Sequence, residues 1–211
     1  MSIPLAQLKE SRFDFINDSQ KVFKTLMMSM AFPGEIRALD KISLCLPIRE
    51  HRFIMQPLLT LLDLETSFHV HCKNTEIRAE VRSYLEISTN SLCVDLTEAD
   101  FVLCLEPSLN GHFEQLKRGS LEMPHTGATV FYLADRILPS QSPLSGGGGV
   151  QLSLSGPGIK ARNGVHLYGI MSEEAEVWRF NRGTFPLGID LYIISRQGEI
   201  IGIPRSVTVR E

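Results

Sequence analysis

The sequence predicts an α/β fold in which a central mixed β-sheet is flanked by helices. Segments whose apolar residues recur at helical spacing alternate along the chain with short runs rich in β-branched residues. The last two runs flank the short polar connection Arg196-Gln197-Gly198-Glu199, which is typical of an antiparallel hairpin. The alternation predicts helices on the faces of the sheet, and the hairpin adds antiparallel strands to it.

Length and charge limit what this fold can do. A chain of 211 residues with 43% hydrophobic residues can bury one full core, so we expect a single domain over residues 1–211. A net charge of -3 gives no basic surface for a phosphate backbone, which argues against nucleic acid as a partner. The chain start lacks a basic region followed by an apolar stretch, and no window approaches the roughly 18 apolar residues of a membrane span. We expect a soluble, cytoplasmic protein without membrane contact.

The first predicted helix is amphipathic. Asp18 or Ser19 can cap its start, and Pro33-Gly34 stops it. The apolar positions of this helix recur at i, i+3 and i+4 spacing and are Val22, Phe23, Leu26, Met27 and Met30. After the helix, a short strand is predicted over residues 35–39.

Residues 53–64 predict a second helix that is strongly apolar. Pro57 interrupts it early, which a helix tolerates only near its first turn. The apolar excess suits either a surface between subunits or a buried helix, and we favour the buried helix. A strand over residues 67–72 follows, and Asn74 or Thr75 can cap the helix after it.

The second half of the chain predicts further strands and helices. Residues 139–149 are rich in Pro, Ser and Gly and predict a loop. Ser155-Gly156-Pro157-Gly158 predicts a tight turn. The other predicted elements are strands over residues 92–95, 101–105, 128–134 and 150–154, a short helix over residues 109–117, and a last helix that opens at Ser172 with three carboxylates in its first turn.

The cysteines predict no metal or redox site. Cys45, Cys72, Cys93 and Cys104 stand singly, and none forms a C-x-x-C pair. We interpret them as reduced thiols, and the apolar neighbours of Cys93 and Cys104 predict that these two are buried.

Candidate phosphate and nucleophile motifs are weak. The glycines at residues 146–149 can form an anion-binding concavity, but they lead into a strand and lack the phosphate-loop pattern, so we favour a flexible turn. Ser155 precedes a Pro-containing turn instead of standing between a strand and a helix, so it is not a nucleophile elbow.

Three histidines are candidate functional groups. His69 and His71 project from one face of a predicted strand and could form half of a metal site, although ordinary hydrogen bonds are the interpretation we favour. His125 lies in a predicted loop, where catalytic residues often occur.

Asp190 is the carboxylate of most interest because it lies in an apolar strand, where a charge needs a partner. Arg205, between Pro204 and Ser206, is a candidate partner. We favour a structural role, as a satisfied buried ion pair or a capping interaction, over a catalytic carboxylate.

Four stretches, taken together and in this order, resemble the PhnH family, the H subunit of the bacterial carbon-phosphorus lyase system for phosphonate breakdown. Each stretch alone is a common turn or apolar strand, but the four in order span nearly the whole chain. They are Phe23 with residues 30–36 (MAFPGEI), residues 154–159 (LSGPGI), residues 185–191 (FPLGIDL) and residues 203–205 (IPR).

The resemblance implies a fold similar to the large domain of type I pyridoxal-phosphate-dependent transferases. It implies a homodimer that assembles with the G, I and J subunits into a core complex acting on ribose-linked alkylphosphonates. Pyridoxal phosphate is not expected within the family, and Lys160, near a turn, lacks an assignable acidic companion for the pyridinium nitrogen. We expect no cofactor and no metal.

Two hypotheses follow. The first is an accessory subunit, with no catalytic residue assigned and with the 139–149 loop and the 155–159 turn near a surface between subunits. The second is a free-standing α/β enzyme, either a nucleotide-binding protein or a transferase. The candidate functional or interface residues are Asp190, Arg205, His125, Gly156 and Gly158.

Overall fold

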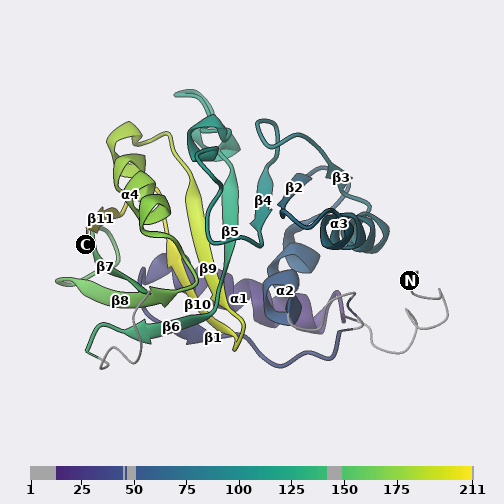
Figure 1. Ribbon diagram of the computed structural model, residues 1–211, viewed down its shortest axis with the longest axis horizontal. Coiled ribbons are helices and arrows are strands. Elements are labelled where there is room, and N and C mark those ends of the chain that lie inside the picture. The colour runs from purple at the N-terminus through teal and green to yellow at the C-terminus, as the bar shows by residue number, and fades with distance from the viewer. Residues whose placement is uncertain (1–12, 45, 47–50, 142–148, 211) are drawn as a thin grey trace.

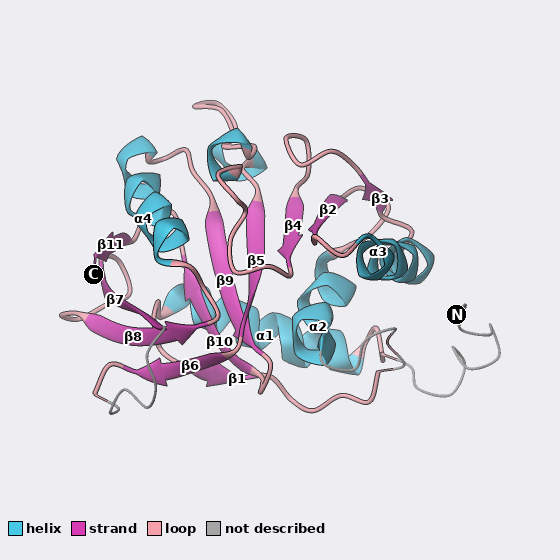
Figure 2. Ribbon diagram, in the orientation of Figure 1, coloured by secondary structure: helices cyan, strands magenta, loops and turns pink. Residues whose placement is uncertain are grey.

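The computed structural model describes residues 13–44, 46, 51–141 and 149–210, and a seven-stranded mixed sheet runs through its centre (Figures 1 and 2). Its five strands β9, β5, β4, β2 and β3 are parallel, and β10 and β1 add antiparallel pairs at one edge. The predicted mixed sheet and terminal hairpin are therefore confirmed. In spatial order the strands are β1 (Arg37–Ala38), β10 (Glu199–Ile203), β9 (Asp190–Ser195), β5 (Thr129–Ala134), β4 (Phe101–Cys104), β2 (Ser67–His71) and β3 (Leu92–Cys93).

Different elements cover the two faces of this sheet. Helices α1 (Asn17–Ala31), α2 (Arg52–Leu61) and α3 (Thr75–Thr89) pack on one face, and α4 (Ser172–Asn181) packs on the other beside a smaller sheet (Figure 1). The smaller sheet is wholly antiparallel. Its order is β11 (Thr208–Arg210), β7 (Gly149–Ser155), β8 (Asn163–Tyr168) and β6 (Arg136–Pro139).

Each central strand feeds two hydrophobic cores because successive side chains point to opposite faces. In β9, Leu191 and Ile193 join the core beneath α4 and the smaller sheet, whereas Tyr192 and Ile194 join the core beneath α1, α2 and α3. In the central strands β5 and β9, every residue after the first is therefore buried.

The helix starts partly confirm the sequence analysis. The Asn74 side chain caps α3, accepting hydrogen bonds from the backbone amides of Glu76 (3.0 Å) and Ile77 (3.1 Å). For α1 the expected cap at Asp18 or Ser19 is wrong. Asp14 Oδ1 instead accepts from the amides of Ile16 (2.9 Å) and Asn17 (3.0 Å), one turn earlier.

Helix α2 is a buried helix, as expected. Its residues from Phe53 to Leu59 are all buried. Pro57 lies in the second turn of the helix instead of the first, where it removes one backbone amide donor.

Other expectations need correction. Over residues 109–117 the structure has a single 3-10 turn, η3 (Phe113–Gln115), because Asn110 (φ 52°) and Gly111 (φ 82°) adopt left-handed conformations that interrupt a helix. Strands β6, β8 and β11 were not predicted, and both ends of the expected 139–149 loop belong to strands β6 and β7. Residues 142–148, including most of the glycine run, lie outside the described residues.

The cysteines that the structure describes are free. Cys72 and Cys104 are buried, but Cys93 is only half-buried, so the prediction holds for Cys104 alone of the two singled out. Cys45 lies outside the described residues. Among the helices in the described ranges, none combines the length and apolarity that a membrane crossing requires.

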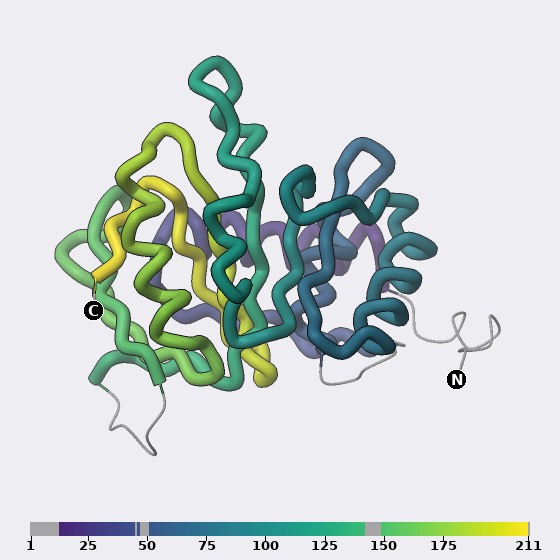
Figure 3. The backbone as a smooth tube through the Cα atoms, turned by 45° about the horizontal axis from the view of Figure 1, so that its top comes forward, coloured from purple at the N-terminus to yellow at the C-terminus, as the bar shows by residue number. Residues whose placement is uncertain are grey.

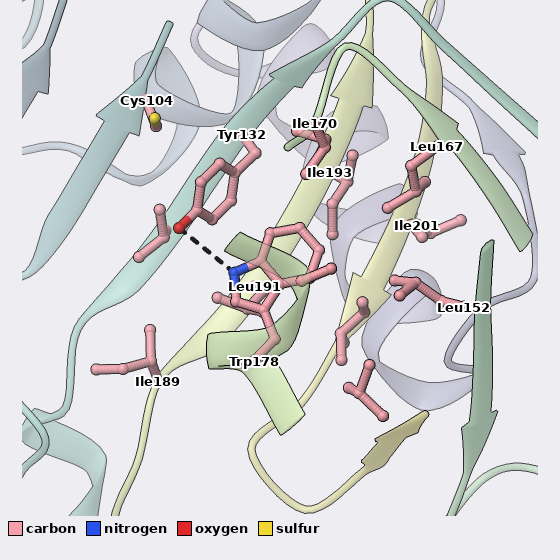
Figure 4. Close-up of a cluster of buried hydrophobic side chains, with 14 of the residues drawn as sticks. Cys104, Tyr132, Leu152, Leu167, Ile170, Trp178, Ile189, Leu191, Ile193 and Ile201 are labelled. Atoms are coloured by element: carbon pink, nitrogen blue, oxygen red, sulfur yellow. Dashed lines mark hydrogen bonds between the residues drawn. The ribbon is translucent and has the colours of Figure 1, made fainter. Parts of the chain in front are cut away.

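A buried carboxylate connects α4 to the sheet. Glu174 is only 2% exposed, and one of its oxygens accepts a hydrogen bond from the Tyr132 hydroxyl while the other accepts from the Leu109 amide (3.1 Å). The Trp178 indole donates to the same hydroxyl (3.5 Å; Figure 4). Burial raises the pKa of Glu174 and that of Tyr132.

We expect Glu174 to make the fold less stable as pH rises. Its pKa is raised in the folded protein, so the folded state holds this proton more tightly than the unfolded chain. Stability is therefore lost from about pH 4.3, the ordinary value of a glutamate, up through the raised value. Chemical denaturation should show this decline in the wild-type protein and a weaker one in Glu174→Gln. Parallel pH profiles for the two proteins would contradict the assignment.

Candidate functional site

The four sequence motifs converge on one hollow in the structure. It has a volume of about 440 Å³ and lies where the C-terminal end of α1 faces the amino ends of β5 and β9. Each motif supplies at least one wall residue. The lining residues are Met30, Ala31, Thr129, Pro157, Gly158, Asp190, Tyr192, Pro204 and Ser206.

The first and second motifs touch through their backbones. Gly158 has φ +82°, and a Cβ at this position would lie 2.3 Å from the carbonyl oxygen of Ala31. The turn itself is closed by a hydrogen bond from the Ile159 amide to the Gly156 carbonyl (3.1 Å), as predicted. The Asn163 side chain adds a second link to the first motif, donating to the carbonyl of Pro33 (2.8 Å). Only glycine at position 158 allows the turn to approach the Ala31 carbonyl this closely.

The third and fourth motifs meet in the ion pair that the sequence suggested. Arg205 donates through Nη2 (2.6 Å) and Nε (3.1 Å) to one Asp190 oxygen, and its backbone amide donates to the other (2.8 Å). The side chains are 12% exposed for Arg205 and 26% for Asp190. Both carboxylate oxygens are thus engaged, which favours the structural interpretation of Asp190.

Arg205 also holds a neighbouring loop. Its Nη1 donates to the carbonyl oxygen of Pro124 (2.5 Å), at the start of the 3-10 turn η4 (Pro124–Thr126). His125 belongs to this turn, but its side chain is exposed. The structure therefore brings the backbone beside His125 to the ion pair, without placing the imidazole in the hollow.

The remaining sequence candidates lie on or near the hollow. Gly158 lines it directly. Gly156 lies beside it, where a Cβ would be 3.2 Å from the carbonyl oxygen of Ser206, a lining residue.

Sequence reasoning missed three lining residues. Thr129 is the strand partner of Asp190 in the pairing of β5 with β9. Tyr192 lies two residues after Asp190 and so points to the same face, where its hydroxyl donates to the carbonyl of Leu26 (3.2 Å). Ser206 directly follows Arg205. Two signals in the sequence could have identified lining residues: the alternation of side chains along a strand for Tyr192, and adjacency to a motif for Ser206.

The two histidines of β2 are held by ordinary hydrogen bonds. His69 Nδ1 lies 2.9 Å from the Val94 carbonyl oxygen, and His71 Nε2 lies 3.0 Å from the Asn110 side-chain amide. Desolvation by burial lowers the pKa of His71. Within the described ranges, no group of three His, Cys, Asp or Glu side chains is placed to hold a metal ion.

The fold and the hollow define a class: an α/β protein whose sequence motifs meet at the amino ends of its parallel strands. This is the edge opposite to the usual ligand crevice of open α/β sheets, which lies at the carboxyl ends. A sequence model of the family described as "Bacterial phosphonate metabolism protein (PhnH)" matches residues 12–210. The chain therefore belongs to the PhnH family, and the match includes every residue that lines the hollow.

Two relatives are similar over most of their lengths. "Putative C-P lyase subunit protein HtxG" of Stutzerimonas stutzeri is 28% identical over 200 residues, which cover 90% of this chain and 85% of the relative. "Alpha-D-ribose 1-methylphosphonate 5-triphosphate synthase subunit PhnH" of Rhizobium meliloti (strain 1021) is 27% identical over 197 residues, covering 92% and 90%.

Gly158→Ala should destabilise the fold by roughly 2 kcal/mol or more, because a left-handed backbone strain adds to the collision with Ala31. Gly111→Ala is the matched control, since Gly111 has the same φ of +82° but nothing within 4 Å of a Cβ. Chemical denaturation should show a cost of about 1 kcal/mol for the control. Equal losses in the two variants would show that the contact is unimportant.

Asp190→Ala should cost roughly 2–3 kcal/mol of unfolding free energy, because it leaves the mostly buried Arg205 guanidinium without its carboxylate. Glu86→Ala removes the acid from an exposed i,i+4 pair with Arg82 and should cost about 0.5 kcal/mol. Denaturation curves of the two variants provide the comparison. A loss for Asp190→Ala no larger than that of the control would contradict a structural role.

Proposed function

We propose that this chain is a subunit of a carbon-phosphorus lyase complex in phosphonate metabolism. Its role is accessory to the formation and processing of ribose-linked alkylphosphonates. Membership in the PhnH family and the printed names of the two relatives support this assignment. The single structural observation that carries it is the convergence of the four family-like motifs on one hollow.

The chemistry of the hollow suits an accessory role better than catalysis by this chain alone. Its charged lining residue, Asp190, forms an ion pair with Arg205. Thr129 and Ser206 contribute hydroxyl groups, and the other walls are apolar or small. Such a surface can receive part of a neighbouring chain or a polar ligand through hydroxyl hydrogen bonds.

We further propose the fold and the assembly that the resemblance to the PhnH family implies. We infer one PhnH-like domain over residues 1–211, since both cores share the same sheet. We also infer a fold like the large domain of type I pyridoxal-phosphate-dependent transferases. The assembly would be a homodimer combined with G, I and J subunits, in the cytoplasm.

The alternative of a free-standing nucleotide-binding protein or transferase has less support. It relied on Asp190, Arg205 and His125 as reacting groups. The first two engage each other, and the third is exposed on η4.

Filling the hollow should impair function without unfolding the protein. Ser206→Trp adds a large side chain to the wall, so a strain relying on this variant should grow several-fold more slowly on methylphosphonate as its only phosphorus source. Growth on inorganic phosphate should be normal. Ser83→Trp, on the exposed surface of α3, is the control and should behave like the wild type.

Thermal melts of both variants would verify folding. Normal growth of the Ser206→Trp strain on methylphosphonate would contradict a role for the hollow. Normal growth of a strain without the gene would contradict the proposed function itself.

A further inference from the structure

A loop with an apolar tip projects from the same end of the molecule as the hollow. It lies between η3 and η4 and stands clear of the other loops at that end (Figure 3). Leu121 is 76% exposed and Met123 is 53% exposed. Beside the loop lies the segment before β9, where Phe185 is 55% exposed. We call Leu121, Met123 and Phe185 the apolar tip.

Hydrogen bonds fix the base of this loop, although the side chains of Leu121 and Met123 are exposed. The Gly188 amide donates to the carbonyl oxygen of Arg118 (3.1 Å), and the Ala128 amide donates to that of Lys117 (2.7 Å). Arg205 adds its hydrogen bond to Pro124. The third and fourth motifs therefore anchor the loop, and binding through the tip would require little further ordering of the backbone.

The end of the loop is a turn closed by hydrogen bonds within residues 120–126. The Met123 amide donates to the Ser120 hydroxyl (3.0 Å), and the Thr126 hydroxyl donates to the Met123 carbonyl (2.9 Å). Two apolar side chains are thus presented to solvent on a closed turn. Exposed apolar groups on a rigid support are typical of protein contact sites.

The charges around the apolar tip are mainly basic. Arg118 lies over the Phe113 ring (5.9 Å), and Arg182 lies over the Phe185 ring (5.2 Å). In the described part of the chain, no carboxylate forms an ion pair with Arg118 or Arg182. Residues 117–127 and 179–188 contain one acidic residue, Glu122. Their basic residues are Arg118, Arg179, Arg182 and Lys117, of which Lys117 already pairs with Asp100 (2.5 Å).

We propose that the apolar tip, with Arg118 and Arg182, docks a different protein subunit through an apolar patch flanked by acidic side chains. Arg118 donates to the Thr184 hydroxyl (3.5 Å), and among the described residues neither Arg118 nor Arg182 pairs with a carboxylate, so both can receive acidic groups of a partner. A second copy fits poorly, because a twofold contact would bring the same basic groups together. The inference rests on the proposed function, because it takes the partner to be another subunit of the complex.

The test is co-purification of the full-length chain with co-expressed G, I and J subunits, one of which carries the affinity tag. The double variant Leu121→Asp, Met123→Asp should lower the amount of this chain retained by at least about tenfold. Ile87→Asp is the matched control, because Ile87 is 67% exposed on α3, and it should be retained normally.

Charge reversal tests the basic part of the surface separately. Arg118→Glu with Arg182→Glu should reduce retention, and Arg136→Glu, at an exposed position of β6, should not. Retention of the wild-type chain should weaken as salt is raised. Circular dichroism of each purified variant separates lost docking from lost folding.

The outcomes distinguish the two proposals. Absence of wild-type co-purification would contradict the proposed function. Wild-type assembly with undiminished retention of both tip variants would contradict the docking surface alone. A change in the solution mass of the isolated chain on Leu121→Asp, Met123→Asp would identify a second copy as the occupant and overturn the inference.

Discussion

The ion pair between Asp190 and Arg205 is the contact on which the organisation of the site depends. It joins the first residue of β9 to the turn after β10, and through the Pro124 carbonyl it extends to η4. Asp190 and Arg205 are 15 residues apart and meet through the hairpin of β9 and β10, whereas Pro124 lies 81 residues before Arg205 and is brought to the pair by the fold. Because both charges are largely withdrawn from water, neither can be removed without leaving the other uncompensated.

The two-sided burial of the sheet explains why polar groups gather at its ends. Within β5 and β9 almost every side chain enters one of the two cores. Thr129 and Asp190 are the first residues of these strands, where the cores end and hydrogen-bonding partners from loops are available. Glu174 lies in the interior instead, where the Tyr132 hydroxyl and the Leu109 amide satisfy both of its oxygens.

Local patterns were sufficient to predict most of the central sheet and its helices, because periodicity and caps are encoded within a few residues. The Asp190 and Arg205 pairing was also predictable, since a carboxylate in an apolar strand requires a cation. The smaller sheet was not predicted. Its strand β8 (Asn163–Tyr168) opens with Asn163-Gly164, which resembles a turn, and is a strand only through its pairing with β7 and β6.

The hollow could not be predicted from such patterns, because its walls come from five segments spread along the chain from Met30 to Ser206. The motifs identified its parts but not their meeting point. What brings them together is a close backbone approach at Gly158 and a strand register, neither of which is visible in the sequence.

The projecting loop is held by contacts to backbone carbonyl groups. Arg205 and Gly188 recognise the carbonyl oxygens of Pro124 and Arg118, and these atoms exist whatever side chains the loop carries. Substitutions at Leu121 or Met123 can therefore accumulate without loosening the base. A scaffold of this kind separates the evolution of partner choice from the evolution of stability, so the same fold can acquire new neighbours by changing a few exposed residues.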